Sequence, residues 1–204
     1  MKGRFPKEAA FSLLWGKRDM ELDNETGLLI IDMQKAIDEP VWDGKNNPAY
    51  ETRILDLLTL WRARQWPIFH IKHNEANPAS TFHTYAPTNA FKPETAPLPG
   101  EIIIEKEVNC AFIGTGLGSM LRMEGCKKLL VCGVVTHNSV DATVRHAGCL
   151  GFETYLVADA CTAVPVVDRT GKEWAAEDVH QLYLSVLNGE YCTVVNMQDV
   201  FTAI

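Results

Sequence analysis

The stretch Gly27-Leu28-Leu29-Ile30-Ile31-Asp32-Met33 places four consecutive large apolar residues directly before a carboxylate. A short apolar run without alternating polar positions is typical of a strand that is buried on both faces of a parallel sheet. A carboxylate at the end of such a strand is poorly solvated, and its pKa rises unless it finds a partner. The stretch therefore predicts a parallel sheet with polar chemistry at its carboxyl edge.

The rest of the chain repeats this pattern. Further apolar runs predict strands at 67–73, 101–106, 128–134, 153–160 and 192–196. Amphipathic stretches predict helices at 50–64, 115–125, 138–150 and 176–188. Strands that alternate with helices predict an α/β fold, a three-layer, doubly wound (Rossmann-like) arrangement with a six-stranded parallel sheet flanked by helices. Residues 74–100 and 161–175 lack clear elements, which is typical of lids and binding loops.

Composition limits the class of protein. The 204 residues are 47% hydrophobic and 22% charged, as in ordinary globular proteins, and no repeat or linker divides them. Residues 1–204 are therefore interpreted as a single domain. The net charge of −7 argues against nucleic acid and anionic membranes as partners, whereas it leaves a small-molecule substrate open. No apolar run approaches the roughly 18 residues of a transmembrane helix.

Two further features bear on the compartment. Basic residues precede the apolar stretch Ala9–Trp15, as in a short signal peptide, but no small-x-small cleavage site follows. We interpret it as an ordinary N-terminal segment. The six cysteines form no C-x-x-C pair and several lie in apolar runs, which favours buried thiols in a reducing compartment over disulfides or zinc. A cytoplasmic location is expected.

Polar residues from three predicted strand ends are candidates for chemistry. Asp32 ends the first strand and Lys106 the third, so an ion pair at one sheet edge is plausible. Ser139 lies between the fourth strand and its helix, where free backbone N–H groups and the helix dipole can activate a nucleophile or stabilise an oxyanion. Each has a simpler interpretation. Asp32 and Ser139 can cap the following turn or helix, Asn138 with Asp141 resembles a capping box, and Lys106 can reach solvent.

Four segments together carry a resemblance to a known family. They are Leu28-Leu-Ile-Ile-Asp32-Met-Gln34, Lys106-Glu-Val-Asn-Cys-Ala-Phe-Ile-Gly-Thr115, Gly133-Val-Val-Thr136 with Ser139-Val140, and Ala147-Gly-Cys-Leu-Gly-Phe152. Their order resembles that of the isochorismatase-like cysteine hydrolases, which include nicotinamidases and N-carbamoylsarcosine amidohydrolases. The resemblance covers the chain from about Gly27. It implies a six-stranded parallel sheet, an Asp–Lys–Cys triad, a small-molecule substrate and a homo-oligomer.

The resemblance also implies roles for individual residues. Asp32 and Lys106 match the first two triad members, and the backbone N–H groups of Val135 and Ser139 match the oxyanion hole. A cis peptide bond between Val134 and Val135 is implied as well. In the intact mechanism the nucleophile attacks a carbonyl, Asp32 acts as base and then as acid, and an acyl intermediate is hydrolysed.

The third triad member departs from the family, because Ser139 stands where the nucleophilic cysteine is expected. A thiol has a pKa of about 8.5 that a helix terminus can lower, whereas a serine hydroxyl needs a strong base, and a carboxylate with a pKa of about 3.9 is a poor one. Three explanations stay open: an engineered Cys→Ser change, natural divergence with slow or different chemistry, and binding without turnover. Some relatives cleave isochorismate, a vinyl ether, without a cysteine.

Other residues are candidates for the pocket. His137 and Asn138 flank Ser139, and His73 ends the second strand. Trp42 and Phe112 are candidates for apolar walls, although aromatic residues are more often part of the core. Some nicotinamidase relatives bind a metal through an Asp-x-His pair. His70, His73 and His83 lack that pair, so neither a metal nor another cofactor is expected.

Overall fold

The computed structural model describes residues 20–204. The interpretation of Ala9–Trp15 as an ordinary N-terminal segment lies outside these residues. Within them, no helix is both long enough and apolar enough to cross a bilayer.

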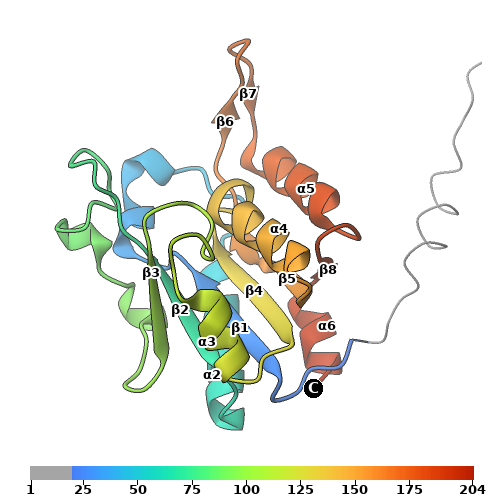
Figure 1. The fold of residues 1–204 in the computed structure, drawn as a ribbon. Helices are drawn as coiled ribbons and strands as arrows, with labels where there is room; N and C mark the ends of the chain where they lie inside the picture. The colour runs from blue at the N-terminus through green and yellow to red at the C-terminus, as the bar shows by residue number, and fades with distance from the viewer. Residues whose placement is uncertain (1–19) are drawn as a thin grey trace, which may run out of the picture.

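Six strands form one parallel sheet, as predicted (Figure 1). Its spatial order is β3-β2-β1-β4-β5-β8. The strands are β1 (Thr26–Ile31), β2 (Ile68–His73), β3 (Ile102–Lys106), β4 (Lys128–Val134), β5 (Glu153–Thr162) and β8 (Thr193–Val195). All of β1 and nearly all of β4 are buried, which explains their continuous apolar sequences.

Helices cover both faces of the sheet, so the doubly wound α/β prediction is confirmed. The helices are α2 (Tyr50–Arg64), α3 (Leu117–Met123), α4 (Asp141–Cys149), α5 (Ala176–Leu187) and α6 (Met197–Thr202). Figure 1 shows α3 and α4 in front of the sheet and α2 behind it. The helical spacing of Ile54, Leu57, Leu58 and Trp61 buries one face of α2, and the Trp61 indole donates a hydrogen bond of 3.0 Å to the Thr26 carbonyl.

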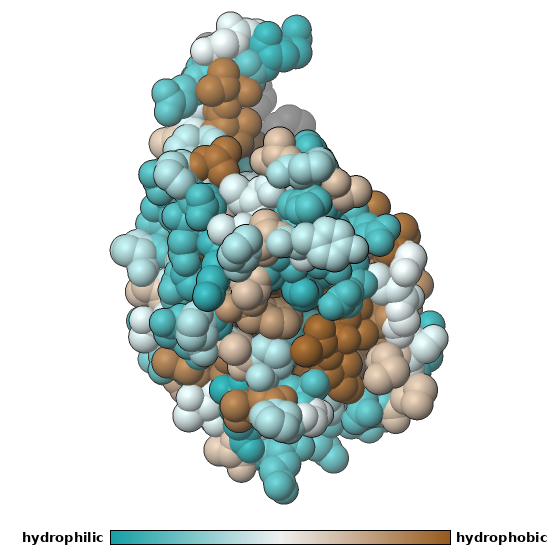
Figure 2. Space-filling model, turned by 90° about the vertical axis from the view of Figure 1, so that its left-hand side faces the viewer, coloured by the Kyte–Doolittle hydropathy of each residue, from teal (hydrophilic) through white to brown (hydrophobic). Residues whose placement is uncertain are grey.

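The two long loops differ from the expectation of no regular structure. Residues 74–100 contain two short 3-10 turns, η3 (Pro87–Asn89) and η4 (Pro93–Thr95). Residues 161–175 contain a small hairpin of β6 (Val166–Val167) and β7 (Glu173–Trp174), which projects from the body of the molecule (Figures 1 and 2). Strands of two residues are too short to produce a periodic sequence signal.

The topology fixes where a ligand can bind. Strands β1 and β4 are neighbours in the sheet. The strand that follows β1 in the chain, β2, lies on one side of this pair, and the strand that follows β4, β5, lies on the other side. This is a topological switch point, and open parallel sheets bind ligands beyond the carboxyl ends of their strands at such a point. Two further short 3-10 turns, η1 (Lys35–Asp38) and η2 (Pro40–Trp42), follow β1 there.

Candidate active site

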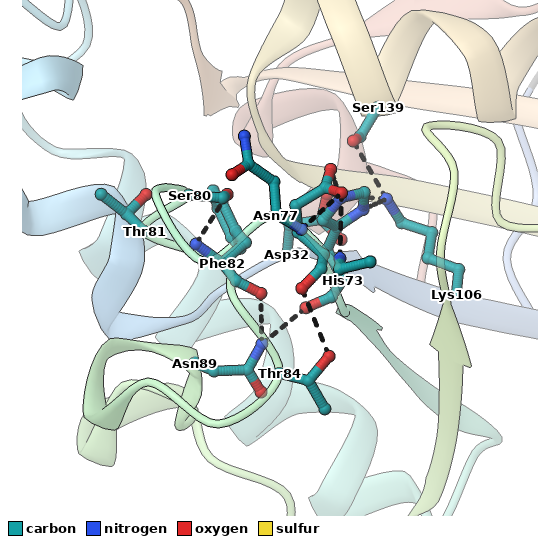
Figure 3. A network of polar contacts seen from close by, with 12 residues as sticks. Asp32, His73, Asn77, Ser80, Thr81, Phe82, Thr84, Asn89, Lys106 and Ser139 are labelled. Carbon is teal, nitrogen blue, oxygen red and sulfur yellow. Dashed lines mark hydrogen bonds and ion pairs between the residues drawn. The ribbon is translucent and has the colours of Figure 1, made fainter.

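The ammonium group of Lys106 is the centre of a buried polar cluster (Figure 3). Its Nζ atom lies 2.9 Å from Asp32 Oδ2, 3.0 Å from His73 Nδ1 and 3.0 Å from Ser139 Oγ. An ammonium group has three N–H donors, and these three contacts use all of them. A lysine that is only 1% exposed thus keeps its charge fully hydrogen-bonded, and it joins Asp32 to Ser139.

The parallel sheet brings these residues together. Asp32 follows β1 directly, and His73 and Lys106 are paired at the ends of β2 and β3. Ser139 lies in η5 (Thr136–Val140), a single π-helical turn between β4 and α4. Parallel strands end at the same edge, so four chain segments place polar groups at one point.

The interpretation of Ser139 or Asn138 as a helix cap is wrong. The N-cap of α4 is Val140 and that of the preceding turn is Val135, and neither of these apolar side chains can form a capping hydrogen bond. The Ser139 hydroxyl instead accepts the Lys106 hydrogen bond. Asp32 does not cap η1 either, because the N-cap there is Gln34, without a side-chain cap. Both polar side chains are therefore directed at the cluster rather than at helix termini.

One oxygen of Asp32 has no partner within residues 20–204. Its Oδ2 atom binds Lys106, whereas its Oδ1 atom is buried without a hydrogen bond. A buried carboxylate oxygen without a donor costs free energy, and such atoms in native structures call for an explanation. A proton donor on a ligand or water would satisfy it. The Asp32 backbone adopts a positive φ of 55°, which is uncommon for a residue with a side chain.

His73 takes part in the cluster as a neutral ring. Burial and then the neighbouring Lys106 charge lower its pKa below the ordinary value. Because its Nδ1 atom faces the Lys106 ammonium, Nδ1 accepts and the ring proton lies on Nε2, 3.8 Å from Glu75 Oε2. His73 was predicted to bind substrate, and its observed contact is with Lys106.

Aromatic rings continue outward from His73. Phe82 contacts His73 edge-on, with ring centroids 5.5 Å apart, and Trp42 contacts Phe82 in the same way at 5.8 Å. The Trp42 indole also donates a hydrogen bond of 2.9 Å to Thr81 Oγ1. Phe82 was not predicted, because it lies in a loop without periodicity. The loop at 74–100 thus supplies one wall beside the cluster (Figure 3).

Two amides anchor this wall and were also missed. Gln34 donates to the carbonyls of His73 and Asn89 and accepts from the His73 N–H. Asn89 donates to the carbonyls of His73 and Phe82. Both are almost fully buried. The one available signal was Gln34 itself, a polar residue three positions after the end of the buried strand β1.

The turn that carries Ser139 has three further features. The Val134–Val135 peptide bond is cis, which confirms what the resemblance implied. His137 lies beside Tyr183 with ring centroids 5.9 Å apart, and burial lowers its pKa. Asn138 is half-buried, and its backbone N–H donates to the Val135 carbonyl. The predicted substrate contacts of His137 and Asn138 stay predictions.

Phe112 lies elsewhere. Its ring stacks on His146 at 5.3 Å and on Phe152 at 6.1 Å, at the C-terminal end of α4. Ser139 precedes the opposite end of that helix. These contacts make Phe112 part of the packing beside α4, and its predicted role as an apolar wall stays a prediction. In the described part of the chain, no three His, Cys, Asp or Glu side chains gather in a way that could hold a metal ion.

Comparisons with known proteins agree with this architecture. The sequence model of the isochorismatase domain family matches residues 26–190. A crystal structure of an isochorismatase-family protein from Chromobacterium violaceum is 44% identical, with a TM-score of 0.87, and the match covers 91% of this chain and 97% of that one. The isochorismatase-family protein YrdC of Bacillus subtilis is 34% identical over 88% of this chain and 96% of its own length. Maleamate amidohydrolase of Pseudomonas putida is 29% identical over 55% of this chain and 48% of its own length.

Proposed function

The chain belongs to the isochorismatase family, and from this premise we propose that it is a hydrolase of a small amide or a related C–N bond. The observation that carries the proposal is the Lys106 ammonium, which joins the Asp32 carboxylate to the Ser139 hydroxyl in a buried site. The amidohydrolase name of one relative supports the amide class.

Each residue has a role in the proposed reaction. Ser139 Oγ attacks the substrate carbonyl, and its proton passes to Asp32. The N–H groups of Val135 and Ser139 stabilise the oxyanion, and Lys106 holds Asp32 and adds positive charge. Asp32 then gives the proton to the leaving nitrogen as the C–N bond breaks. Water hydrolyses the resulting acyl ester, and Asp32 again accepts and returns a proton.

Serine should make the acylation slow. No hydrogen bond joins Ser139 Oγ to Asp32 among the described residues, and His73 Nδ1 already accepts from Lys106. The hydroxyl thus has no strong base beside it. Each loss of about 1.4 kcal/mol of transition-state stabilisation slows a reaction about tenfold, so the deficit readily reaches several orders of magnitude.

Ammonia release from a panel of small amides tests the proposal. We expect low or no release from the chain as it is, a large gain for Ser139→Cys, and loss of that gain in Ser139→Cys/Asp32→Asn. Ser185→Cys is the matched control, because it adds a thiol at an exposed serine of α5. If the unchanged chain is fully active and Ser139→Cys is no faster, the role of Ser139 in place of a thiol nucleophile is overturned. If no variant releases ammonia, the amide proposal itself is overturned.

A second candidate is the cleavage of a vinyl ether without a covalent nucleophile, with Asp32 as the acid. The unpartnered Oδ1 atom of Asp32 favours it, because this atom can hold the proton that such a reaction needs. Product analysis separates the two candidates, since ether cleavage releases no amine. A ligand-binding protein without turnover is the outcome if neither product forms.

Self-association is part of the proposal. The family resemblance implied a homo-oligomer, and the projecting hairpin exposes apolar surface to solvent (Figure 2), with Val167 67% exposed. Light scattering at micromolar concentration should give at least the mass of a dimer. A monomer would contradict it.

A further inference from the structure

A buried histidine outside the Lys106 cluster contacts the turn that carries Ser139. His180 lies on α5 and is 2% exposed. Its Nδ1 atom is 2.8 Å from Thr136 Oγ1. Thr136 begins the π-helical turn and directly follows Val135. His180 therefore reaches the segment that supplies both the proposed nucleophile and the proposed oxyanion hole, without contacting either group itself.

The other side of the His180 ring faces a second anchored group. Its Nε2 atom is 3.4 Å from Asn47 Nδ2, which donates hydrogen bonds of 2.6 Å to the Cys161 carbonyl and 3.2 Å to the Ala158 carbonyl. These two carbonyls belong to the irregular part of β5, where the pairing with β4 shifts register. A continuous set of polar contacts thus runs from β5 through Asn47 and His180 to Thr136.

The turn itself supplies little of its own support. A π-helical turn is rare and occurs mostly as a single turn, frequently at functional sites. Its N-cap is the apolar Val135 and the N-cap of the following helix is the apolar Val140, so neither side chain can cap. Burial also lowers the pKa of His180, so the ring is neutral, with one donor and one acceptor nitrogen. A neutral, fully enclosed ring is a rigid support for the Thr136 hydroxyl.

We propose that His180 is a positioning residue that acts through Thr136 to hold the Thr136–Val140 turn in its reactive placement. This inference rests on the proposed function. Catalytic groups need close placement, and a shift of about 1 Å can cost about a hundredfold in rate. The contact between His180 and Thr136 places the proposed nucleophile and oxyanion hole, which act in the transition state. Loss of this contact should therefore lower kcat more than it raises KM.

The first test uses the Ser139→Cys background. His180→Ala and Thr136→Val should each lower kcat by about tenfold or more, with KM changed by less than about twofold. The double variant should be no slower than the worse single one, because both changes remove one interaction. His180→Asn should recover much of kcat, since its side-chain amide can replace Nδ1. His70→Asn is the control, because this histidine is equally buried but bonds to Glu101.

A second readout does not depend on knowing a substrate. Peptide-resolved mass spectrometry can follow the alkylation by iodoacetamide of the thiol that Ser139→Cys introduces. His180→Ala should change the rate or the pH midpoint of this alkylation at least several-fold, and His180→Asn should restore it. If no amide is hydrolysed, the proposed function fails, while the alkylation still decides the positioning role. Unchanged kcat and unchanged alkylation in folded His180→Ala, or additive effects with Thr136→Val, would overturn the inference.

Discussion

Lys106 Nζ and Asp32 Oδ2 form an ion pair 2.9 Å apart, and their side chains are only 0% and 4% exposed. Removing one member of a buried pair leaves an uncompensated charge, which typically costs about 3–5 kcal/mol. We therefore expect Lys106→Met to lower the free energy of unfolding by about this amount in urea titrations. Asp32→Asn/Lys106→Met should lose less than the sum of the two single variants, because no lone charge remains.

A surface pair provides the matched control. Lys127 Nζ lies 2.7 Å from Glu25 Oε1, but these side chains are 72% and 40% exposed. Exposed pairs contribute about 0–1 kcal/mol, so Lys127→Met should change the free energy of unfolding by less than about 1 kcal/mol. Equal losses for Lys106→Met and Lys127→Met would show that burial is not what makes the Lys106–Asp32 pair important.

Gly133 should not tolerate a side chain. Its φ is +123°, and a Cβ atom there would overlap the Ile31 carbonyl oxygen and lie 2.6 Å from the Ile31 nitrogen. Gly133→Ala would thus push β4 away from β1, next to the Val134–Val135 peptide. We expect loss of soluble protein or a fall in Tm of more than about 10 °C, because the overlap is with backbone that cannot rotate away.

Gly116→Ala is the control for that change, because a Cβ atom at Gly116 has no neighbour within 4 Å in the described part of the chain. Its Tm should stay within a few degrees of the unchanged chain. A Gly133→Ala protein with the same Tm as the unchanged chain would mean that β4 can shift without loss of stability.

The sequence predicted the sheet well because its central strands β1 and β4 are buried on both faces. The runs that end at Asp32 and at Val134 are almost purely apolar, and no other element explains such short runs between helices. The small hairpin at Val166–Trp174 and the short helix α6 were not predicted. Two-residue strands and a six-residue helix bury too little surface to impose a pattern.

The site was predictable only in part, for a similar reason. Asp32, Lys106 and Ser139 could be predicted because parallel strands end at one edge of the sheet. The simpler interpretations of Asp32 and Ser139 as caps depend on where the following turns begin, and the structure places the N-caps at Gln34 and Val140 instead. The positions of Phe82 and His180 depend on how a loop and α5 fold back over that edge. Such long-range packing leaves no local periodicity, so spacing along the chain could not reveal it.

The wall formed by residues 74–100 should loosen when its anchor is removed. Asn89→Ala deletes the hydrogen bonds that its side chain donates to the His73 and Phe82 carbonyls. We expect faster hydrogen exchange and proteolysis within 74–100, with smaller changes in the sheet. Asn77→Ala is the control in the same loop, because Asn77 is exposed and, among residues 20–204, its side chain accepts a hydrogen bond only from the nearby Ala79 N–H. Equal exchange in both variants would contradict the anchoring role of Asn89.

Stability should fall as the solution becomes mildly acidic. Burial lowers the pKa of His70, His73, His137 and His180 below the ordinary value of about 6.5. The unfolded chain therefore binds protons at these positions before the folded protein does. The stability they confer is complete above about pH 6.5 and is lost as the pH falls below that value toward the folded pKa values, by up to about 1.4 kcal/mol per pH unit for each histidine.

Urea titrations between pH 7.5 and 5.5 measure this loss. Glu101 has a pKa lowered to about 2 from the ordinary value of 4.5. The stability that it contributes is therefore lost only as the pH falls below 4.5 toward 2, which lies outside this window. His180→Asn should reduce the slope of unfolding free energy against pH, because the variant removes one of the buried groups that titrate. A free energy of unfolding that stays level or rises from pH 7 to 5.5 would show that these rings protonate as readily in the folded protein as in the unfolded chain.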